Sequence, residues 1–508
     1  MRTTLLLLAA LARLALPSTV LETAVELPAG SFTPPGAKSP LTNLPAFCRV
    51  AGSIRPSPDS GIRFETWLPV SGWNGKFQGI GNGGYAGSIS YGGLAEALRH
   101  GYASASTDTG HRASGQDAAW ALNHPEKIAD FGHRAIHETT VKAKALVAAY
   151  YGSPARRAYF NSCSNGGRQA LMEAQRYPED YDGIIAGAPA NYWTKLMLHA
   201  ASMMKATLAD PAAYIPASKL PALQAAALAA CDANDQLRDG VIENPAQCRF
   251  DPSSPLCQAA ASDQCFTAPQ LQALRLIYGG TRDASGKLLA RGYPMGGEAE
   301  RGGWAGWITG DAPERSAMFF FGTNFFKYMV HNDPAWDYRN FDPARDLQAA
   351  RRAASPQLDA DNPDLSRFRA RGGKLILYHG WSDAAIPATY IIDYYQAVQK
   401  KLGAKKAAGF VRLFLVPGMQ HCGGGSGANS FGQGGVAQGD PGSNIAAALE
   451  RWVDHGVAPE EIIATRFKPG SPATPEKTHP LCAYPKTAVY NSAGDPNAAS
   501  SFSCRAPE

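Results

Sequence analysis

Ser164 lies in a run that could form the sharp turn of a nucleophile elbow. An apolar stretch, Tyr159–Asn161, is followed by Ser-Cys-Ser-Asn-Gly and then by a helical pattern that starts at Gly167. Such a turn packs its flanking backbone tightly, so small residues are needed two positions before and two positions after the serine. Gly166 meets this need, and Ser162 stands where glycine is usual. The run predicts an activated serine for acyl transfer, with an ordinary strand-turn-helix connection as the alternative.

A base and an acid should follow this serine along the chain, each on a loop that leaves a strand. His421 comes directly after the apolar run 410–416, and Asp383 follows the strand predicted over 374–379. The other histidines beyond Ser164 have simpler explanations, such as inserted structure, a strand end, a helix C-terminus or the proline-rich tail. The order and spacing therefore favour a triad of Ser164, Asp383 and His421.

Two cysteines neighbour the proposed triad. Cys163 precedes Ser164 and Cys422 follows His421, so a disulfide between them would tie the two loops together. Two buried free thiols are one alternative, and a nucleophilic Cys163 is another. We favour the disulfide because nine cysteines and a leader-like N-terminus indicate an oxidising compartment.

These residues resemble the tannase and feruloyl esterase family, which includes the bacterial mono(2-hydroxyethyl) terephthalate hydrolase. In that family a Cys-Ser pair at the elbow and a His-Cys pair at the base loop are joined by a disulfide, and Cys163-Ser164 and His421-Cys422 match them. Three further runs are similar to the family: 73–77, 101–111 and 379–387. The resemblance covers roughly residues 45–505. It implies an α/β-hydrolase fold and a serine esterase that works through an acyl-enzyme.

The resemblance also implies roles that spacing alone leaves open. An oxyanion hole needs two amides, and Asn165, directly after the nucleophile, supplies the first. The glycine-rich run 79–84 follows an apolar strand, and the resemblance selects Gly83 from it, although a plain glycine turn is the alternative. Four disulfides are implied, with Cys48 left over: Cys163–Cys422, Cys231–Cys248, Cys257–Cys265 and Cys482–Cys504.

An acidic loop lies at residues 231–243. Its three aspartates crowd a short, turn-rich stretch between two cysteines, and hard oxygen ligands at this density suit calcium. Spacing alone slightly favours a solvated acidic loop. The resemblance implies a structural Ca²⁺ held by five residues: Asp232, Asp235, Asp239 and, through their carbonyl oxygens, Leu237 and Val241.

The pattern of elements divides the chain into four parts. Residues 1–23 are predicted to be a signal peptide, because their apolar stretch is too short for a membrane span. Strand and helix patterns alternate over 45–190 and again over 372–508, which predicts the two parts of an α/β-hydrolase core, the second with a polar C-terminal tail. Ala-rich helices and irregular, aromatic-rich sequence over 191–371 predict an inserted lid domain that carries the calcium loop.

Composition agrees with a large secreted enzyme. The chain has 508 residues, 45% of them hydrophobic, which is enough for a sizeable core. Its net charge of +5 is small, and the lysines and arginines are dispersed, so nucleic-acid binding has no support. We expect an extracellular or periplasmic protein without a membrane span.

The substrate is the least determined feature. Trp and Phe side chains are denser between residues 304 and 328 than the 10% aromatic content of the whole chain. Either all of these rings form the core of the lid, or some of them face the acyl group. With the resemblance, this favours small esters of hydroxycinnamic or hydroxybenzoic acids, with polysaccharides or polyphenols as candidate leaving groups. A serine peptidase on the same fold and a non-catalytic carbohydrate- or surface-binding relative are the alternatives.

Overall fold

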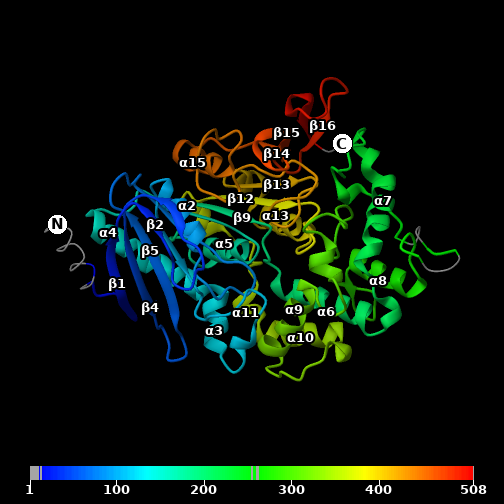
Figure 1. The fold of residues 1–508 in the computed structure, drawn as a ribbon, viewed down its shortest axis with the longest axis horizontal. Helices are drawn as coiled ribbons and strands as arrows, with labels where there is room; N and C mark the ends of the chain where they lie inside the picture. The colour runs from blue at the N-terminus through cyan, green and yellow to red at the C-terminus, as the bar shows by residue number, and fades with distance from the viewer. Residues whose placement is uncertain (1–10, 12–13, 253–255, 259–261, 507–508) are drawn as a thin grey trace.

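The computed structural model describes residues 11, 14–252, 256–258 and 262–506 (Figure 1). A nine-stranded sheet runs through its centre. Its strand order is β1 (Thr19–Leu27), β4 (Phe47–Ile54), β5 (Ile62–Pro69), β7 (Ala103–Thr107), β6 (Lys76–Ile80), β8 (Arg157–Cys163), β9 (Gly183–Gly187), β12 (Lys374–Gly380) and β13 (Val411–Val416). The strands from β7 to β13 pair in parallel, and β1, β4 and β5 add an antiparallel edge.

Helices cover both faces of this sheet. One face shares a core with α4 (Ala135–Tyr151), α5 (Asn165–Arg176) and α13 (Thr389–Leu402). The opposite face packs against α2 (Tyr91–Arg99) and α15 (Ile445–His455). In β12, Leu375 and Leu377 belong to the first core, and Ile376 and Tyr378 to the second. Because both faces are buried, these strands are continuous apolar runs in the sequence.

Parallel pairing decides where the catalytic candidates lie. The carboxyl ends of β8, β12 and β13 meet at one edge of the sheet, and ligands bind at this edge in open α/β sheets. Ser164, Asp383 and His421 all follow these strand ends. The mostly parallel, doubly covered sheet with an elbow after β8 is the predicted α/β-hydrolase architecture.

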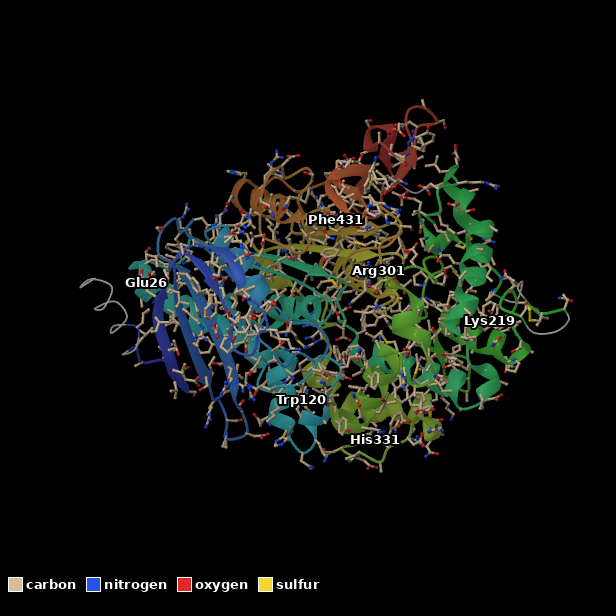
Figure 2. All side chains as sticks on the ribbon, in the orientation of Figure 1. Glu26, Trp120, Lys219, Arg301, His331 and Phe431 are labelled. Carbon is tan, nitrogen blue, oxygen red and sulfur yellow. A yellow bond between two sulfur atoms is a disulfide. The ribbon has the colours of Figure 1, made fainter. Side chains whose placement is uncertain are left out.

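A long segment is inserted between two neighbouring strands. β9 and β12 pair directly, although residues 188–373 lie between them in the chain. This inserted segment is mainly helical: α6 (Trp193–Leu208), α7 (Leu220–Cys231), α8 (Ala268–Gly279), α9 (Ala317–Asn324), α10 (Pro343–Ala353), α11 (Ser355–Leu358) and α12 (Ser366–Ala370). It has its own apolar core and lies on the side of the molecule away from β1, where Lys219, Arg301 and His331 mark it (Figures 1 and 2).

The sheet begins earlier than the sequence indicates. β1 precedes residue 45 and pairs with β4 along its length. The predicted signal peptide, residues 1–23, lies partly outside the described residues, which include residues 11 and 14–23, and residues 19–23 belong to β1. A cut ahead of Thr19 would leave this strand whole.

Two hairpins complete the C-terminal part. β14 (Glu461–Lys468) pairs with β15 (Ser471–Cys482), and β16 (Thr487–Tyr490) pairs with β17 (Phe502–Arg505). Of the helices that the structure describes, none has the length and apolar character needed to span a bilayer.

Candidate active site

Ser164 occupies a strained turn between β8 and α5. Its φ is +67°, in the left-handed region that residues with a side chain rarely adopt. The Ser164 amide donates to the Gly187 carbonyl at 2.9 Å, and its own carbonyl accepts from the Arg168 amide at 3.0 Å. These bonds to β9 and α5 fix the turn, which is the predicted nucleophile elbow.

Ser162, in the position where glycine is usual, is accommodated by two other glycines. A Cβ atom at Gly166 or at Gly81 would overlap the Ser162 hydroxyl. The elbow therefore keeps its tight packing, because Gly166 and Gly81 have no side chains that would collide with Ser162.

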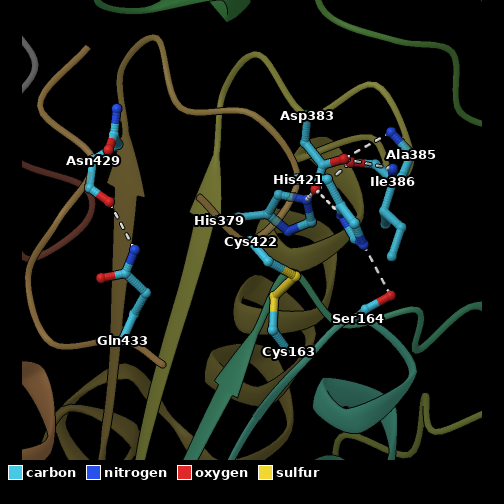
Figure 3. The surroundings of a disulfide bond; sticks show 10 residues. All are labelled: Cys163, Ser164, His379, Asp383, Ala385, Ile386, His421, Cys422, Asn429 and Gln433. Carbon is cyan, nitrogen blue, oxygen red and sulfur yellow. Dashed lines mark hydrogen bonds and ion pairs between the residues drawn. A yellow bond between two sulfur atoms is a disulfide. The ribbon is translucent and has the colours of Figure 1, made fainter. Parts of the chain in front are cut away.

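The structure brings Ser164, His421 and Asp383 together (Figure 3). His421 Nε2 lies 2.9 Å from Ser164 Oγ, and His421 Nδ1 lies 2.9 Å from Asp383 Oδ2. An ionised carboxylate only accepts, so Nδ1 carries the proton and Nε2 is left to accept from the serine hydroxyl. This arrangement can remove a proton from Ser164 and return it later.

Asp383 is buried and surrounded by donors. The amides of Ala385 and Ile386 donate to its Oδ1 at 2.8 and 2.9 Å. Burial alone raises the pKa of Asp383, but His421 and His379 reverse this effect and hold it below its ordinary value. Asp383 is therefore ionised in the folded protein.

His379 is the residue that sequence analysis passed over as part of a strand end. It is fully buried, and its Nε2 lies 2.9 Å from the Ile386 carbonyl and 3.1 Å from Asp383 Oδ2. Nε2 must therefore carry a proton, which both acceptors share. Within the described residues, Nδ1 has no hydrogen-bond partner. The signal in the sequence is its position four residues before the acid.

A disulfide joins the elbow to the base loop. Cys163 and Cys422 are bonded, with their Cα atoms 6.0 Å apart (Figure 3). Cys163 is thus no free thiol, which removes it as a nucleophile. The other three predicted disulfides are also present: Cys231–Cys248, Cys257–Cys265 and Cys482–Cys504. Burial, with a smaller effect of Glu26, raises the pKa of the remaining Cys48 thiol to about 12.

The glycine-rich loop after β6 lies against the elbow. The Asn82 amide donates to Gln169 Oε1 of α5 at 2.9 Å, which holds the loop beside the start of this helix. A Cβ atom at Gly83 would meet nothing within 4 Å, so space is open there. Among the bonds of the described residues, none uses the amide of Gly83 or of Asn165. Both predicted oxyanion donors are therefore free to bind.

The inserted segment reaches the base loop. The Trp307 ring stands nearly edge-on to His421, with centroids 5.0 Å apart, and Trp307 is half-buried. Gln420 Nε2 donates to the Gly297 carbonyl at 2.8 Å, directly before His421. Trp307 is therefore positioned to form a wall beside the reacting atoms.

Two hollows of about 400 and 580 Å³ lie elsewhere. The first is formed by α13, the C-terminal hairpins and residues 243–247, and the second by the antiparallel edge of the sheet. Neither is lined by Ser164, Asp383 or His421. The hydrogen-bonded side chains of the candidate site therefore do not line either of these two cavities.

The acidic loop uses its carboxylates within itself. Asp232 Oδ2 accepts from the Gly240 amide at 3.2 Å, and Asp235 and Asp239 each accept from an amide two residues later at 3.1 Å. Lys477 of β15 also pairs with Asp239. Within the described residues, the ligand atoms of these three carboxylates do not all lie within 4.8 Å of one another.

The chemistry of this loop nevertheless fits a cation. Asp232 Oδ1 is buried and finds no hydrogen-bond partner among the described residues. Burial, with Glu243 and Asp239 nearby, raises the pKa of Asp235 to about 6. A hard cation would relieve both the unpaired oxygen and the repulsion among the carboxylates.

Comparison with known proteins agrees with this geometry. Residues 48–505 match the family model described as tannase and feruloyl esterase. The chain is 42% identical over 520 residues to an uncharacterised esterase of Xanthomonas campestris pv. campestris, covering 97% of this chain and 90% of that protein. It is 35% identical over 434 residues to a probable feruloyl esterase B-2 of Aspergillus flavus, covering 84% of this chain and 81% of that protein.

Solved structures show the same fold. The crystal structure of feruloyl esterase B from Aspergillus oryzae superposes with a TM-score of 0.89 at 29% identity, covering 98% of this chain and all of that chain (100%). Tannin acyl hydrolase from Aspergillus niger gives a TM-score of 0.75 at 22% identity, covering 98% and 94%. The predicted α/β-hydrolase fold is confirmed.

Proposed function

This chain belongs to the tannase and feruloyl esterase family and is a carboxylic ester hydrolase, and from that premise we propose that Ser164 carries the reaction through an acyl-enzyme. The observation that supports this most directly is the continuous path of hydrogen bonds from Ser164 Oγ through His421 to Asp383. A base oriented by a buried carboxylate is the arrangement that activates a serine.

The proposed reaction has two halves. As Ser164 Oγ attacks the ester carbonyl, His421 Nε2 takes its proton, and the amides of Asn165 and Gly83 donate to the oxygen that becomes negative. The ester C–O bond then breaks, and His421 gives the proton to the leaving alcohol. Water repeats the sequence on the acyl-enzyme, which releases the acid and restores Ser164.

Asp383 and His379 have supporting roles in this proposal. Asp383 fixes the Nδ1–H tautomer of His421 and stabilises the imidazolium that forms. His379 acts as a positioning residue, because its Nε2–H bridges Asp383 Oδ2 and the Ile386 carbonyl and so holds the carboxylate toward His421. It contacts no reacting atom.

Covalent labelling tests which residue is the nucleophile. A fluorophosphonate probe should modify the enzyme once, and mass spectrometry should place the label on Ser164. Ser164→Ala is the control that should not be labelled. A label on another residue, or labelling that persists in Ser164→Ala, would contradict the proposal.

We propose esters of hydroxycinnamic or hydroxybenzoic acids as substrates. Of the aromatic residues between 304 and 328, Trp304, Phe325 and Phe326 are buried in the core of the inserted segment. Trp307 instead contacts His421 and lies parallel to Phe321 at a centroid distance of 6.3 Å. A planar acyl group beside Trp307 could gain about 0.5–1.5 kcal/mol from ring contacts beyond its burial.

A matched panel of methyl esters tests this substrate class. Methyl ferulate and methyl gallate should have higher kcat/KM than methyl butyrate. Trp307→Leu should lower the ratio of aromatic to aliphatic kcat/KM about threefold to tenfold. Phe320→Leu is the matched control, since Phe320 is exposed (36%). If methyl butyrate is turned over at least as efficiently as each aromatic ester, the aromatic-acyl proposal is wrong.

We also propose that the acidic loop holds a structural Ca²⁺. Asp232, Asp235 and Asp239 would supply carboxylate oxygens, and Leu237 and Val241 would supply carbonyl oxygens. The ion would neutralise the crowded carboxylates and stiffen the loop that Cys231–Cys248 closes. It takes no part in the chemistry of Ser164.

Four disulfides support secretion into an oxidising compartment, extracellular or periplasmic, since such bonds are rare in the reducing cytosol. Thiol titration of the unfolded, unreduced protein should find one free thiol, that of Cys48. Several free thiols in active protein would contradict this assignment.

A further inference from the structure

A second group of metal-ligand-type side chains lies where α4, α5 and the loop before β9 meet, and α5 is the helix that begins after Ser164. His137 of α4, Glu173 of α5 and Asp180 of the loop before β9 each offer one ligand atom, and these atoms all lie within 4.8 Å of one another. In the part of the chain that the structure describes, no other group of three histidine, cysteine or acidic side chains converges this closely. The proposed reaction uses none of the three.

Glu173 is the unusual member of this group. It is completely buried, and neither carboxyl oxygen has a hydrogen-bond partner among the described residues. A buried carboxyl group without partners is costly. Asp180 lies beside it, and the ligand atoms of the two carboxyl groups are within 4.8 Å of each other. Two carboxyl groups this close require a proton or a cation between them.

His137 and Asp180 are held in place beside Glu173. His137 Nδ1 lies 2.7 Å from Asp180 Oδ2, and the His137 ring stacks on Tyr177 at 3.8 Å. The His137 side chain is 24% exposed, and that of Asp180 is 5% exposed. The group is therefore open to solvent on the histidine side and closed on the glutamate side.

The negative charge of the group has little cationic compensation. Among the ion pairs of the described residues, neither Glu173 nor Asp180 is paired with a lysine or an arginine. Lys144 lies nearby, but its ammonium binds the backbone carbonyl of Asp180 rather than the carboxylate. A bound cation would supply the charge that the protein does not.

We propose that His137, Glu173 and Asp180 form a binding site for a divalent cation that accepts both imidazole and carboxylate ligands, such as Zn²⁺. Three protein ligands with water on the open side make up a common zinc coordination set. Metal–ligand bonds of about 2.0–2.2 Å place tetrahedral ligand atoms about 3.4 Å apart. This spacing is below the 4.8 Å within which the three ligand atoms lie. A shared proton would give Glu173 one hydrogen bond, whereas the cation would neutralise both carboxylates.

This site would join three separate parts of the fold. α4, α5 and the loop before β9 each contribute one ligand, so the ion would act as a structural clip behind the elbow helix. Its nitrogen ligand also distinguishes it from the oxygen-only set of the acidic loop, and the two sites should prefer different ions.

Zinc binding tests the proposal on the full-length protein. Metal is removed with a chelator, and the protein is returned to buffer with saturating Ca²⁺ so that the acidic loop is supplied. Calorimetric titration with ZnCl₂ should then show a bound ion that Glu173→Gln does not bind. Zinc at about one hundred times its Kd should raise the Tm of the wild type by about 2 °C or more, and should not raise that of Glu173→Gln.

A matched histidine variant controls for binding elsewhere. His124 Nδ1 pairs with Asp59 Oδ1 at 2.7 Å, and this pair belongs to no converging group of three in the described residues. His124→Gln should keep the zinc response. Should Glu173→Gln not fold, His137→Gln replaces it, because the His137 ring reaches the surface.

Two outcomes would overturn the site. Equal zinc binding by the wild type and by Glu173→Gln would mean that zinc binds elsewhere. If the wild type binds no zinc and Glu173→Gln is at least as stable, Glu173 is a protonated carboxyl group only. Neither result depends on ester turnover, so the proposed esterase function is tested separately.

Discussion

The sheet edge that carries Ser164 and the acidic loop of the inserted segment both depend on aspartates, but they hold them in opposite ways. Asp383 is surrounded by four donors, and its pKa is held below the ordinary value. In the loop, Asp232 keeps a buried oxygen without a partner among the described residues, and the pKa of Asp235 is raised. The protein supplies partners for both oxygens of Asp383, whereas in the loop one buried oxygen of Asp232 is left without a partner among the described residues.

This difference follows from how each site is built. The edge is formed by the ends of parallel strands, whose spacing is fixed by the sheet and by the Cys163–Cys422 disulfide. The loop is a short irregular stretch closed by Cys231–Cys248. A site on a rigid sheet is ready before substrate arrives, whereas the crowded loop would gain stability from the cation that we propose for it.

The largest expected effect comes from the sheet edge. Ser164→Ala should lower kcat by about 10⁴-fold or more, because no oxygen is left for His421 to activate. Its Tm should stay close to that of the wild type, since among the described residues the hydroxyl bonds only to His421. Steady-state kinetics and a thermal melt check both, and substantial residual turnover in a folded variant would move the chemistry to another residue.

Two of the four disulfides allow the sheet edge and the acidic loop to be tested separately. Replacing Cys163 and Cys422 by alanine should lower both kcat/KM and Tm, because the bond fixes the elbow against the base loop. Replacing Cys231 and Cys248 should lower Tm but leave kcat/KM within about threefold at temperatures well below Tm. Iodoacetamide without reductant should inactivate neither the wild type nor the loop variant, and rapid inactivation would refute the Cys163–Cys422 bond.

Variants of His379 test how strongly its hydrogen bond to Asp383 affects kcat. His379→Leu removes the donor to Asp383 Oδ2 and should lower kcat about tenfold with little change in KM, because positioning of His421 is lost while substrate contacts remain. His379→Gln keeps an N–H donor and should recover part of the loss. Equal kcat for the wild type and both variants would show that the donor is dispensable.

Calcium removal tests the loop. Chelation with EGTA, or Asp232→Asn, should lower Tm by a few degrees, whereas kcat at 25 °C should change less than about twofold, because the proposed ion takes no part in the reaction at Ser164. Added Ca²⁺ should restore the Tm of the chelated wild type. If purified protein contains no calcium and Asp232→Asn melts like the wild type, the loop is a solvated turn.

The smallest expected effect is an acid sensitivity of the inserted segment. Burial lowers the pKa of His199, on α6, to about 4. The unfolded chain binds this proton near pH 6.5, so stability is complete above that pH and is lost as pH falls toward 4. The loss should be roughly 2 kcal/mol at pH 5. His199→Gln should reduce the drop in Tm between pH 7 and pH 5, and an unchanged drop would exclude His199 as its source.

Much of the fold follows from local sequence. The apolar runs at 374–379 and 410–416 correspond to β12 and β13, and the elbow follows β8 as the small residues around Ser164 indicate. The triad candidates could be selected because parallel strands place their carboxyl ends at one edge. Side-chain periodicity and the residue preferences of turns depend on only a few neighbouring residues, so the sequence alone predicts these elements.

Other features required the tertiary structure. Sequence placed His379 on a strand end, but only the return of the loop through Ile386 brings it to Asp383. Likewise, Trp307 meets His421, and Glu173 meets His137, across elements that are distant in the chain. These long-range contacts depend on how helices and loops pack on the sheet. The free energy of that packing is summed over the whole core and has no local signature in the sequence.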